Sequence, residues 1–163
     1  MKVLKKQTNS KMCIVCGMDN PAGLHAPFYE MEDHTVVTLF KFADIHQSYP
    51  ERTHGGLITT MLDELIGRAL WIDEPEVWGV TATINVKFRK PVPLNETLKG
   101  VGQITENKRR IFKGIGKLYN EAGEVVAEAE AVYVKLPLDK VVSTHEHDSE
   151  INIYIPDDVK EIK

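Results

Sequence analysis

One segment near the middle of the chain carries the hydrophobic pattern of an α-helix. Between residues 56 and 72 apolar positions recur every three or four residues, which places them on one broad stripe of a helix. The positions are Leu57, Ile58, Met61, Leu62, Leu65, Ile66, Ala69 and Leu70. The run Asp73-Glu74-Pro75 then ends the pattern. Because the stripe is wider than a surface helix needs, we expect this helix to be largely buried.

A β-hairpin is predicted before the helix. Apolar and β-branched residues fill 28–31 and 35–40, and the turn-forming residues 32–34 separate them. Residues 43–53 are polar and read as a loop, and residues 1–25 look irregular because they are rich in polar and turn-forming residues.

Strand patterns dominate the chain after the helix. Residues 77–89 alternate in hydrophobicity, and we expect Val80, Ala82, Ile84, Val86 and Phe88 to share one face. Further strands are predicted at 97–105, 109–119 and 125–136, the last two joined by a turn at 120–124. One buried helix followed by an antiparallel meander predicts an α+β fold.

The pattern divides the chain into three parts. We predict an irregular N-terminal leader at 1–25, one folded domain at 26–137 and a charged C-terminal extension at 138–163. Within the extension, residues 151–155 are apolar enough to add a short strand or to dock on a partner. A chain of 163 residues is long enough to bury a core as one domain.

Charge and composition exclude several classes of partner. The formal net charge is -4 and the pI is about 5.9, whereas nucleic acids and anionic membranes select basic proteins. The N-terminal lysines precede no apolar run, and no uncharged stretch is long enough to span a bilayer. With only two cysteines, we expect a cytoplasmic protein that has no nucleic-acid or membrane partner.

The start of the predicted helix is a candidate site. His54-Gly55-Gly56 brings unpaired backbone N–H groups to a helix N-terminus, where two glycines let another group approach closely. Such donors can form an oxyanion hole, and a tight turn without a ligand would have the same sequence.

A second candidate lies further along the same helix. Asp63 is surrounded on its helical face by small residues, which leaves room for a ligand or for another backbone. The same pattern fits an ordinary solvated acid. We interpret Glu64 as structural, because Arg68 follows it at the spacing of a helix-surface ion pair.

The motif Cys13-x-x-Cys16 suggests a metal or redox site. Zinc requires four ligands, and no second such motif exists, so His25, His34 or the pair His145 and His147 would have to complete it. A thioredoxin-like role lacks its βαβ context. Ordinary packing is therefore favoured, and we predict no metal site.

Three segments resemble hotdog-fold acyl-CoA thioesterases of the phenylacetyl-CoA type. The run from His54 to Glu64 is similar to their HGG turn and following acid, residues 80–92 to the strand after the helix, and residues 123–133 to the last strand. Residues 13–24 are similar to a leader found in one subset. The resemblance covers roughly residues 13–136.

The resemblance implies an architecture, an assembly and a substrate. In the hotdog fold an antiparallel sheet wraps around one long central helix, here about 56–72, within the domain 26–137. The family pairs its sheets, so we expect a homodimer or a dimer of dimers with active sites at the subunit interface. The implied reaction is hydrolysis of an acyl-CoA thioester, which needs no cofactor because CoA is part of the substrate.

The resemblance also implies a role for each residue of the motif. Gly55 would donate its N–H to the thioester carbonyl, with Gly56 close by. Asp63 of the facing subunit would act as general base or nucleophile. Thr81 would orient the water or the carboxylate, and His54 would shape the turn and help to polarise the carbonyl.

Other contacts to the substrate are expected nearby. Thr83 is the second choice for the orienting hydroxyl. Many relatives carry Asn or Gln in the loop before the HGG turn, where this chain has Ser48 beside Gln47, so either side chain is a candidate.

Two basic clusters suit the phosphates of CoA or are simply solvated strand ends. They are Lys87 with Arg89 and Lys90, and Arg109 with its neighbours Lys108 and Arg110.

The residues leave two other functions open. The same fold can hold an acyl-CoA without turnover, as a regulatory binding module. A hydratase or dehydratase of this fold would pair an acid with a histidine for proton transfer at carbon. In this sequence His54 adjoins the glycine turn instead of pairing visibly with Asp63, so hydrolysis is the preferred prediction.

Overall fold

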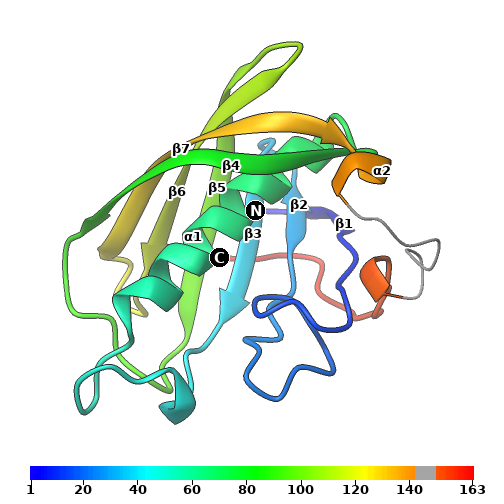
Figure 1. The fold of residues 1–163 in the computed structure, drawn as a ribbon. Helices are drawn as coiled ribbons and strands as arrows, with labels where there is room; N and C mark the ends of the chain where they lie inside the picture. Colours follow the sequence, from blue (N-terminus) through cyan, green and yellow to red (C-terminus); the bar gives the residue numbers. More distant parts are fainter. Residues whose placement is uncertain (142–149) are drawn as a thin grey trace.

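A seven-stranded antiparallel sheet curls around one long helix in the computed structural model, which describes residues 1–141 and 150–163 (Figure 1). The strands are β1 (Val3–Lys6), β2 (Tyr29–Met31), β3 (Val36–Phe40), β4 (Val77–Phe88), β5 (Leu98–Asn107), β6 (Ile111–Tyr119) and β7 (Val125–Pro137). They lie in the order β1-β2-β3-β5-β6-β7-β4, and every neighbouring pair is antiparallel. This sheet wrapped around a helix is the α+β architecture predicted from the sequence.

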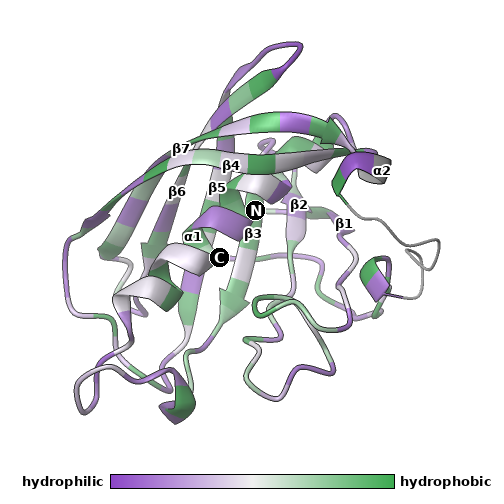
Figure 2. Cartoon of the chain, in the orientation of Figure 1, coloured by the Kyte–Doolittle hydropathy of each residue, from purple (hydrophilic) through white to green (hydrophobic). Residues whose placement is uncertain are grey.

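The central helix α1 spans Gly55–Ala69 and continues into the 3-10 turn η2 (Leu70–Ile72), as predicted for residues 56–72. Its apolar stripe packs against the concave face of the sheet; the buried members are Ile58, Met61, Leu62, Leu65, Ile66 and Ala69. A Cβ atom on Gly102 of β5 would lie 2.5 Å from the carbonyl oxygen of Leu65, so the helix rests directly on the strand. Along β7 buried residues alternate with more exposed ones, and Figure 2 shows the accompanying alternation of hydropathy.

Strand β4 departs from the predicted alternation. Its register with β7 shifts between Thr81 and Thr83, which leaves Ala82 without a partner in the ladder. Beyond this bulge Ile84 and Val86 pack against the core, whereas Val80 and Ala82 are exposed. The prediction that all five apolar positions share one face is therefore wrong. The extra residue, Ala82, shifts the alternation, so apolar residues before the bulge point to the opposite face from those after it.

The first 25 residues contain a strand that the sequence pattern did not indicate. β1 pairs with β2 at the edge of the sheet, and it alternates too weakly to be recognised because its middle residues are exposed. In the tail, Ile153 exchanges two backbone hydrogen bonds with Asn9 as an isolated bridge, so residues 151–155 add no full strand. The two termini lie side by side (Figure 1), and the Met1 amino group donates to the Ile162 carbonyl at 2.8 Å.

The remaining elements are short. The predicted loop at 43–53 contains the 3-10 turn η1 (Asp44–His46), and α2 (Leu138–Val141) follows β7. The residues His145 and His147 lie outside the described part of the chain. Within residues 1–141 and 150–163, no helix has the length and hydropathy needed to cross a bilayer.

Candidate active site

The start of α1 has one free backbone donor. His54 caps the helix: its Nδ1 accepts the Gly56 N–H at 2.9 Å, and its carbonyl accepts the N–H groups of Leu57 and Ile58. The Gly55 N–H has no acceptor among the described residues. Of the two glycine amides expected near a carbonyl oxygen, only that of Gly55 is therefore available, and the His54 imidazole shapes the turn by holding the other.

The Asp63 carboxylate is held by two hydroxyl groups. Thr81 Oγ1 on β4 donates to Asp63 Oδ1 at 2.7 Å, so the β4 bulge brings Thr81 to the helix. The Tyr133 hydroxyl on β7 lies 3.1 Å from the same oxygen and 2.8 Å from the Asp63 carbonyl. Thr81 was predicted for this position, and Tyr133 was not.

Tyr133 is a buried and oriented donor. Its ring stacks on Phe112 with the centroids 4.6 Å apart, and only 2% of the residue is exposed. Burial raises the pKa of Tyr133 well above its usual value, and the charge of Asp63 raises this pKa further. The phenol therefore keeps its proton and donates it toward Asp63. A buried tyrosine hydroxyl requires a partner, which was the only sequence signal for this role.

Asp63 opens into a small recess of about 90 Å³. Thr81 and Tyr133 line it together with the indoles of Trp71 and Trp78, whose ring centroids are 4.8 Å apart. The recess therefore joins a carboxylate to an aromatic wall.

The ion pair expected between Glu64 and Arg68 is present, with Nε 2.7 Å from Oε1. Arg68 is buried, however, and not at the helix surface. Its guanidinium lies 4.3 Å from the ring centroid of Phe28 and 4.9 Å from that of Trp71. The sequence spacing identified the pair but not its burial, because the leader residues that contact Arg68 lie about 60 positions earlier in the sequence.

A single chain does not bring the two candidate groups together. Gly55 and Asp63 are eight residues apart on α1, which corresponds to about 12 Å along the helix axis. Each group lies beside a different end of β4: Thr81 touches Asp63, and a Cβ atom on Gly55 would lie 3.5 Å from the Phe88 ring.

The loop before the helix leaves two polar side chains exposed. Gln47 and Ser48 are both exposed, and Gln47 forms a backbone bridge with Thr53, next to the helix start. The neighbouring His46 is buried, and both of its ring nitrogens are bonded to backbone groups at 2.8 Å. Of these three residues, only Gln47 and Ser48 are therefore free to face a ligand.

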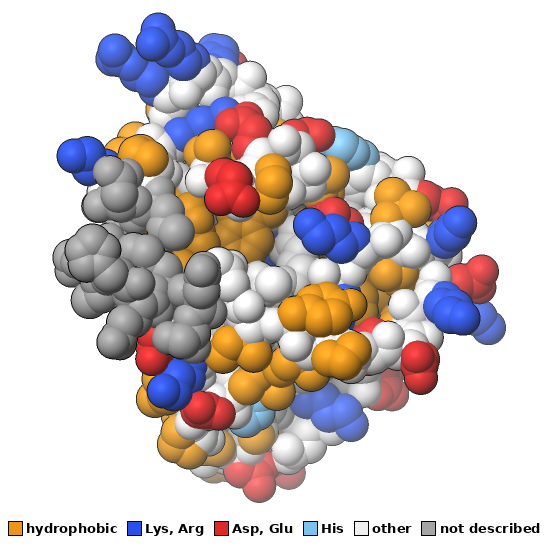
Figure 3. Space-filling view, turned by 90° about the vertical axis from the view of Figure 1, so that its right-hand side faces the viewer, with side chains coloured by type: hydrophobic (Ala, Val, Ile, Leu, Met, Phe, Trp, Pro, Cys, Tyr) orange, Lys and Arg blue, Asp and Glu red, His pale blue; other side chains and the backbone are white. Residues whose placement is uncertain are grey.

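The two basic clusters lie at opposite ends of the sheet. Lys87 and Arg89 are at the end of β4 near the helix start, and Arg89 pairs with Glu128. Arg109 is in the β5–β6 turn, near Val80 at the other end of β4, about 26 Å away by strand length. Figure 3 shows Lys and Arg side chains gathered at the tip of the molecule where this turn projects in Figure 1.

Thr83 is separated from Asp63 by the bulge. It lines a different hollow, together with Asn85 and Glu130. Lys87 lines a neighbouring hollow with Glu128. Neither hollow includes Asp63, so within one chain Thr83 is not brought to the carboxylate. The prediction that Lys87 meets the phosphates of CoA does not require it to lie there.

Comparisons with known proteins find similarity to thioesterases. Residues 52–127, which contain the helix start, Asp63 and Thr81, match the family model described as "Thioesterase superfamily". The acyl-coenzyme A thioesterase THEM4 of Rattus norvegicus is 27% identical over 117 residues, which are 71% of this chain and 50% of that protein. The chain thus spans about half the length of this curated relative.

Solved structures share the fold at low identity. The Escherichia coli PaaI protein of the phenylacetic acid degradation operon has a TM-score of 0.62 at 15% identity, covering 69% of this chain and 80% of that one. A Bacillus halodurans protein solved with CoA has a TM-score of 0.60 at 24% identity, covering 67% and 72%. The resemblance seen in the sequence is confirmed: residues 52–127 match the thioesterase superfamily, and the chain around them has the hotdog fold.

Proposed function

We propose that this protein hydrolyses acyl-CoA thioesters in active sites shared by two copies of the chain. Two features of α1 carry the proposal. The carboxylate of Asp63 is held by Thr81 and Tyr133 from the sheet, and the N–H of Gly55, the first residue of the helix, lacks an acceptor in the described structure. The match to the thioesterase superfamily supports this reaction class, as does the similarity to a rat acyl-coenzyme A thioesterase.

The exposed strand β4 supports a shared site. It is a 12-residue strand at the edge of the sheet, and Val80 and Phe88 are exposed on it by 43% and 54%. Long exposed edges of this kind invite pairing with another strand. Antiparallel pairing of two β4 strands about a twofold axis would set the Thr81 end of one chain against the Phe88 end of the other. Asp63 of one subunit would then approach Gly55 of its partner.

The chemistry follows from these two groups. The Gly55 N–H would donate to the thioester carbonyl oxygen as it gains negative charge. Asp63 would take a proton from the water that attacks the carbonyl carbon, and CoA would leave as the thiolate. Alternatively, Asp63 would attack the carbonyl carbon itself and expel CoA, and water would then hydrolyse the resulting acyl-aspartyl anhydride to the free acid. Thr81 and Tyr133 fix the carboxylate, and His54 holds the turn. This reaction uses no cofactor, because CoA belongs to the substrate.

Substrate contacts are proposed on both sides of the helix start. Gln47 and Ser48 are exposed beside it and would contact the acyl group or its carbonyl. Lys87 and Arg89 lie at the same end of β4 and would meet the phosphates of CoA, whereas Arg109 lies at the Asp63 end.

The two free cysteines suit a reducing compartment such as the cytoplasm.

The test is release of CoA thiol from a panel of short, long and aromatic acyl-CoAs. Asp63→Asn is nearly isosteric and should lower turnover by at least about 100-fold in a folded protein, because the amide cannot accept the proton. Asp73→Asn is the control, since Asp73 is exposed and pairs only with His34 among the described residues. Near-normal activity of folded Asp63→Asn would contradict the mechanism. Acyl-CoA binding without thiol release by the unmodified protein would instead identify a non-catalytic module.

A further inference from the structure

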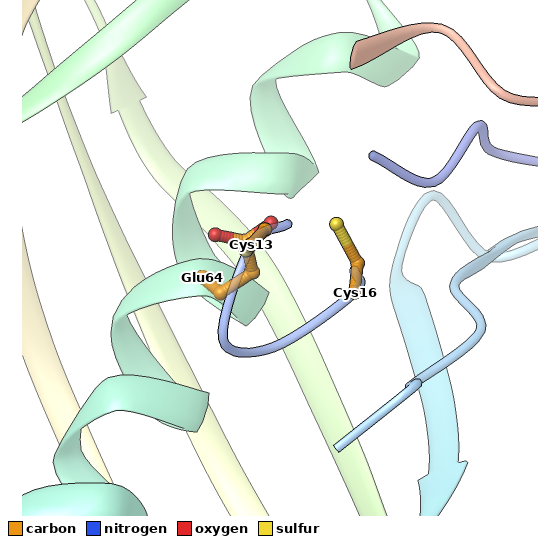
Figure 4. A group of neighbouring side chains, drawn as sticks. All are labelled: Cys13, Cys16 and Glu64. Carbon is orange, nitrogen blue, oxygen red and sulfur yellow. The ribbon is translucent and has the colours of Figure 1, made fainter. Parts of the chain in front are cut away.

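The two cysteines of the leader meet a carboxylate of the central helix. The Sγ atoms of Cys13 and Cys16 and a carboxylate oxygen of Glu64 all lie within 4.8 Å of one another. Figure 4 shows the two cysteines on one tight turn, facing the α1 helix that carries Glu64. The motif alone supplies two ligands, and folding adds a third from a residue about 50 positions away in the sequence.

Backbone N–H groups in and beside the turn that carries the cysteines donate to both sulfur atoms. The Gly17 N–H donates to the Cys13 carbonyl at 2.8 Å, and a Cβ atom on Gly17 would lie only 2.3 Å from that oxygen, so the turn requires glycine. The Val15 N–H donates to Cys13 Sγ at 3.3 Å, and the Ser10 N–H donates to Cys16 Sγ at 3.3 Å. Backbone donors aimed at sulfur stabilise thiolates, and outer-shell bonds of this kind orient metal ligands.

The charges around the cluster suit a divalent cation. Buried Arg68 holds one oxygen of Glu64, with Nε 2.7 Å from Oε1, which leaves the other oxygen for a second partner. Two thiolates and one carboxylate are together neutralised by Arg68 and one divalent ion. Buried charges are tolerated when they are compensated in this way.

We propose that Cys13, Cys16 and Glu64 bind a zinc-like divalent transition-metal ion, with water as the fourth ligand. Thiolates select zinc and related metals over magnesium and calcium, which take oxygen ligands. The Glu64 side chain is 28% exposed, so the cluster has a solvent side from which metal and water can enter. The ion would fasten the leader to α1 one residue after Asp63. This proposal does not depend on the hydrolase activity.

Cobalt is the spectroscopic probe for this site. Full-length protein, reduced and stripped of metal, is titrated with Co²⁺ and then with competing Zn²⁺. We expect thiolate-to-cobalt charge-transfer absorption that saturates near one ion per chain and is lost when Zn²⁺ is added. Because the chain has only two cysteines, this absorption can come from no other side chains, and the six histidines cannot produce it. Zinc should also protect both thiols from alkylation.

Three variants identify the ligands. Cys13→Ser should weaken Zn²⁺ binding by at least about 100-fold and reduce the charge-transfer absorption, as should Cys16→Ser. Glu64→Gln should keep the absorption but weaken the affinity, with a folded circular dichroism spectrum. Asp63→Asn is the matched control, because it changes the neighbouring carboxylate and should bind metal normally while losing hydrolysis.

Two results would overturn the metal site. One is the absence of charge-transfer absorption in protein whose thiols are shown to be reduced. The other is wild-type Zn²⁺ affinity in both folded Cys13→Ser and folded Glu64→Gln. Neither result bears on thiol release from acyl-CoA by the unmodified protein, so failure of the metal site and failure of the hydrolase proposal are distinguishable.

Discussion

The amide of Gly55 can be removed without disturbing the helix that it opens. Proline is favoured at the first position of a helix, where its missing N–H would be unpaired in any case. The preceding residue, His54, already has the extended backbone that proline requires, with φ -65° and ψ 129°. We therefore predict that Gly55→Pro folds normally and loses about 100- to 1000-fold in turnover, the usual effect of removing one oxyanion donor.

The variant Gly55→Ala distinguishes the loss of the amide donor from the effect of added side-chain bulk. It keeps the N–H, and its new Cβ atom would meet Phe88 at an ordinary contact distance of 3.5 Å. Its turnover should stay close to that of the unmodified protein in the same thiol-release assay. Equal losses in the alanine and proline variants would show that bulk at this position, and not the donor, limits the reaction.

Two buried tyrosines make the free energy of unfolding depend on pH in the alkaline range. Burial raises the pKa of Tyr29 and of Tyr133 above the usual value of 10, and hydrogen bonds to Asp157 and Asp63 raise these pKa values further. The protonated phenols are therefore favoured by folding. Their contribution is fully present below about pH 10 and is lost progressively as the pH rises above it.

We predict that the free energy of unfolding falls above about pH 10 and that part of this fall disappears in Tyr29→Phe and Tyr133→Phe. Urea denaturation between pH 8 and about pH 11 measures the effect, and phenolate absorbance reports the ionisation. If both variants lose stability with pH as steeply as the unmodified protein, these phenols are not its cause. The Phe112 stacking contact survives in Tyr133→Phe, so that variant tests the hydroxyl alone.

The sequence predicted the positions of the candidate residues along the helix better than the contacts that they make. His54, Gly55 and Asp63 could be placed because they lie on one helix, whose geometry follows from its own pattern. Tyr133 could not be assigned, since its hydroxyl reaches Asp63 only through the pairing of β7 with β4. Contacts between distant strands depend on register, which a local pattern does not specify.

At the scale of elements, the β4 bulge determines which side chains reach the helix. A regular strand would alternate without interruption from Val80 to Phe88 and would turn Thr81 away from Asp63. The unpaired Ala82 reverses this order and brings the Thr81 hydroxyl to the carboxylate. An inserted residue leaves an apolar alternation looking regular in the sequence, so the pattern predicted the strand but not its two faces.

The contact between α1 and β5 requires a glycine. A Cβ atom on Gly102 would lie 2.5 Å from the Leu65 carbonyl oxygen, and neither backbone can move without displacing the helix. We predict that Gly102→Ala lowers the free energy of unfolding by roughly 1–3 kcal/mol, the usual cost of overpacking. Chemical denaturation measures it.

Gly67→Ala is the matched comparison within α1. Its Cβ atom would meet only the edge of the Tyr133 ring, at 3.6 Å, and alanine favours a helix by up to about 1 kcal/mol over glycine. This variant should be as stable as the unmodified protein or slightly more stable. If both substitutions destabilised the protein equally, the close approach at β5 would not be the cause.

At the scale of the whole molecule, the hydrophobic pattern was sufficient for the architecture of the sheet and helix. The attachment of the ends of the chain was not predictable. β1 is a short edge strand whose two middle residues are exposed, and Ile162 is buried against Tyr29 and Met31 from the far end of the sequence. Such contacts join segments that carry little periodicity of their own, so no pattern within either segment indicates them.

The proposed sharing of each site between two chains makes a prediction about mixtures. Gly55→Pro lacks the amide donor and Asp63→Asn lacks the carboxylate, so each variant should be nearly inactive by itself. In a mixed dimer, one of the two sites would combine the intact amide of one chain with the intact carboxylate of the other. Random exchange of subunits should therefore restore about one quarter of the unmodified activity.

Because about 12 Å of helix separates the two groups within a chain, complementation requires that they meet across an interface. The measurement is thiol release after the variants are unfolded and refolded together, compared with the two refolded separately and then combined. Full inactivity of a mixture in which mixed dimers are demonstrated would place both groups of a working site in one chain.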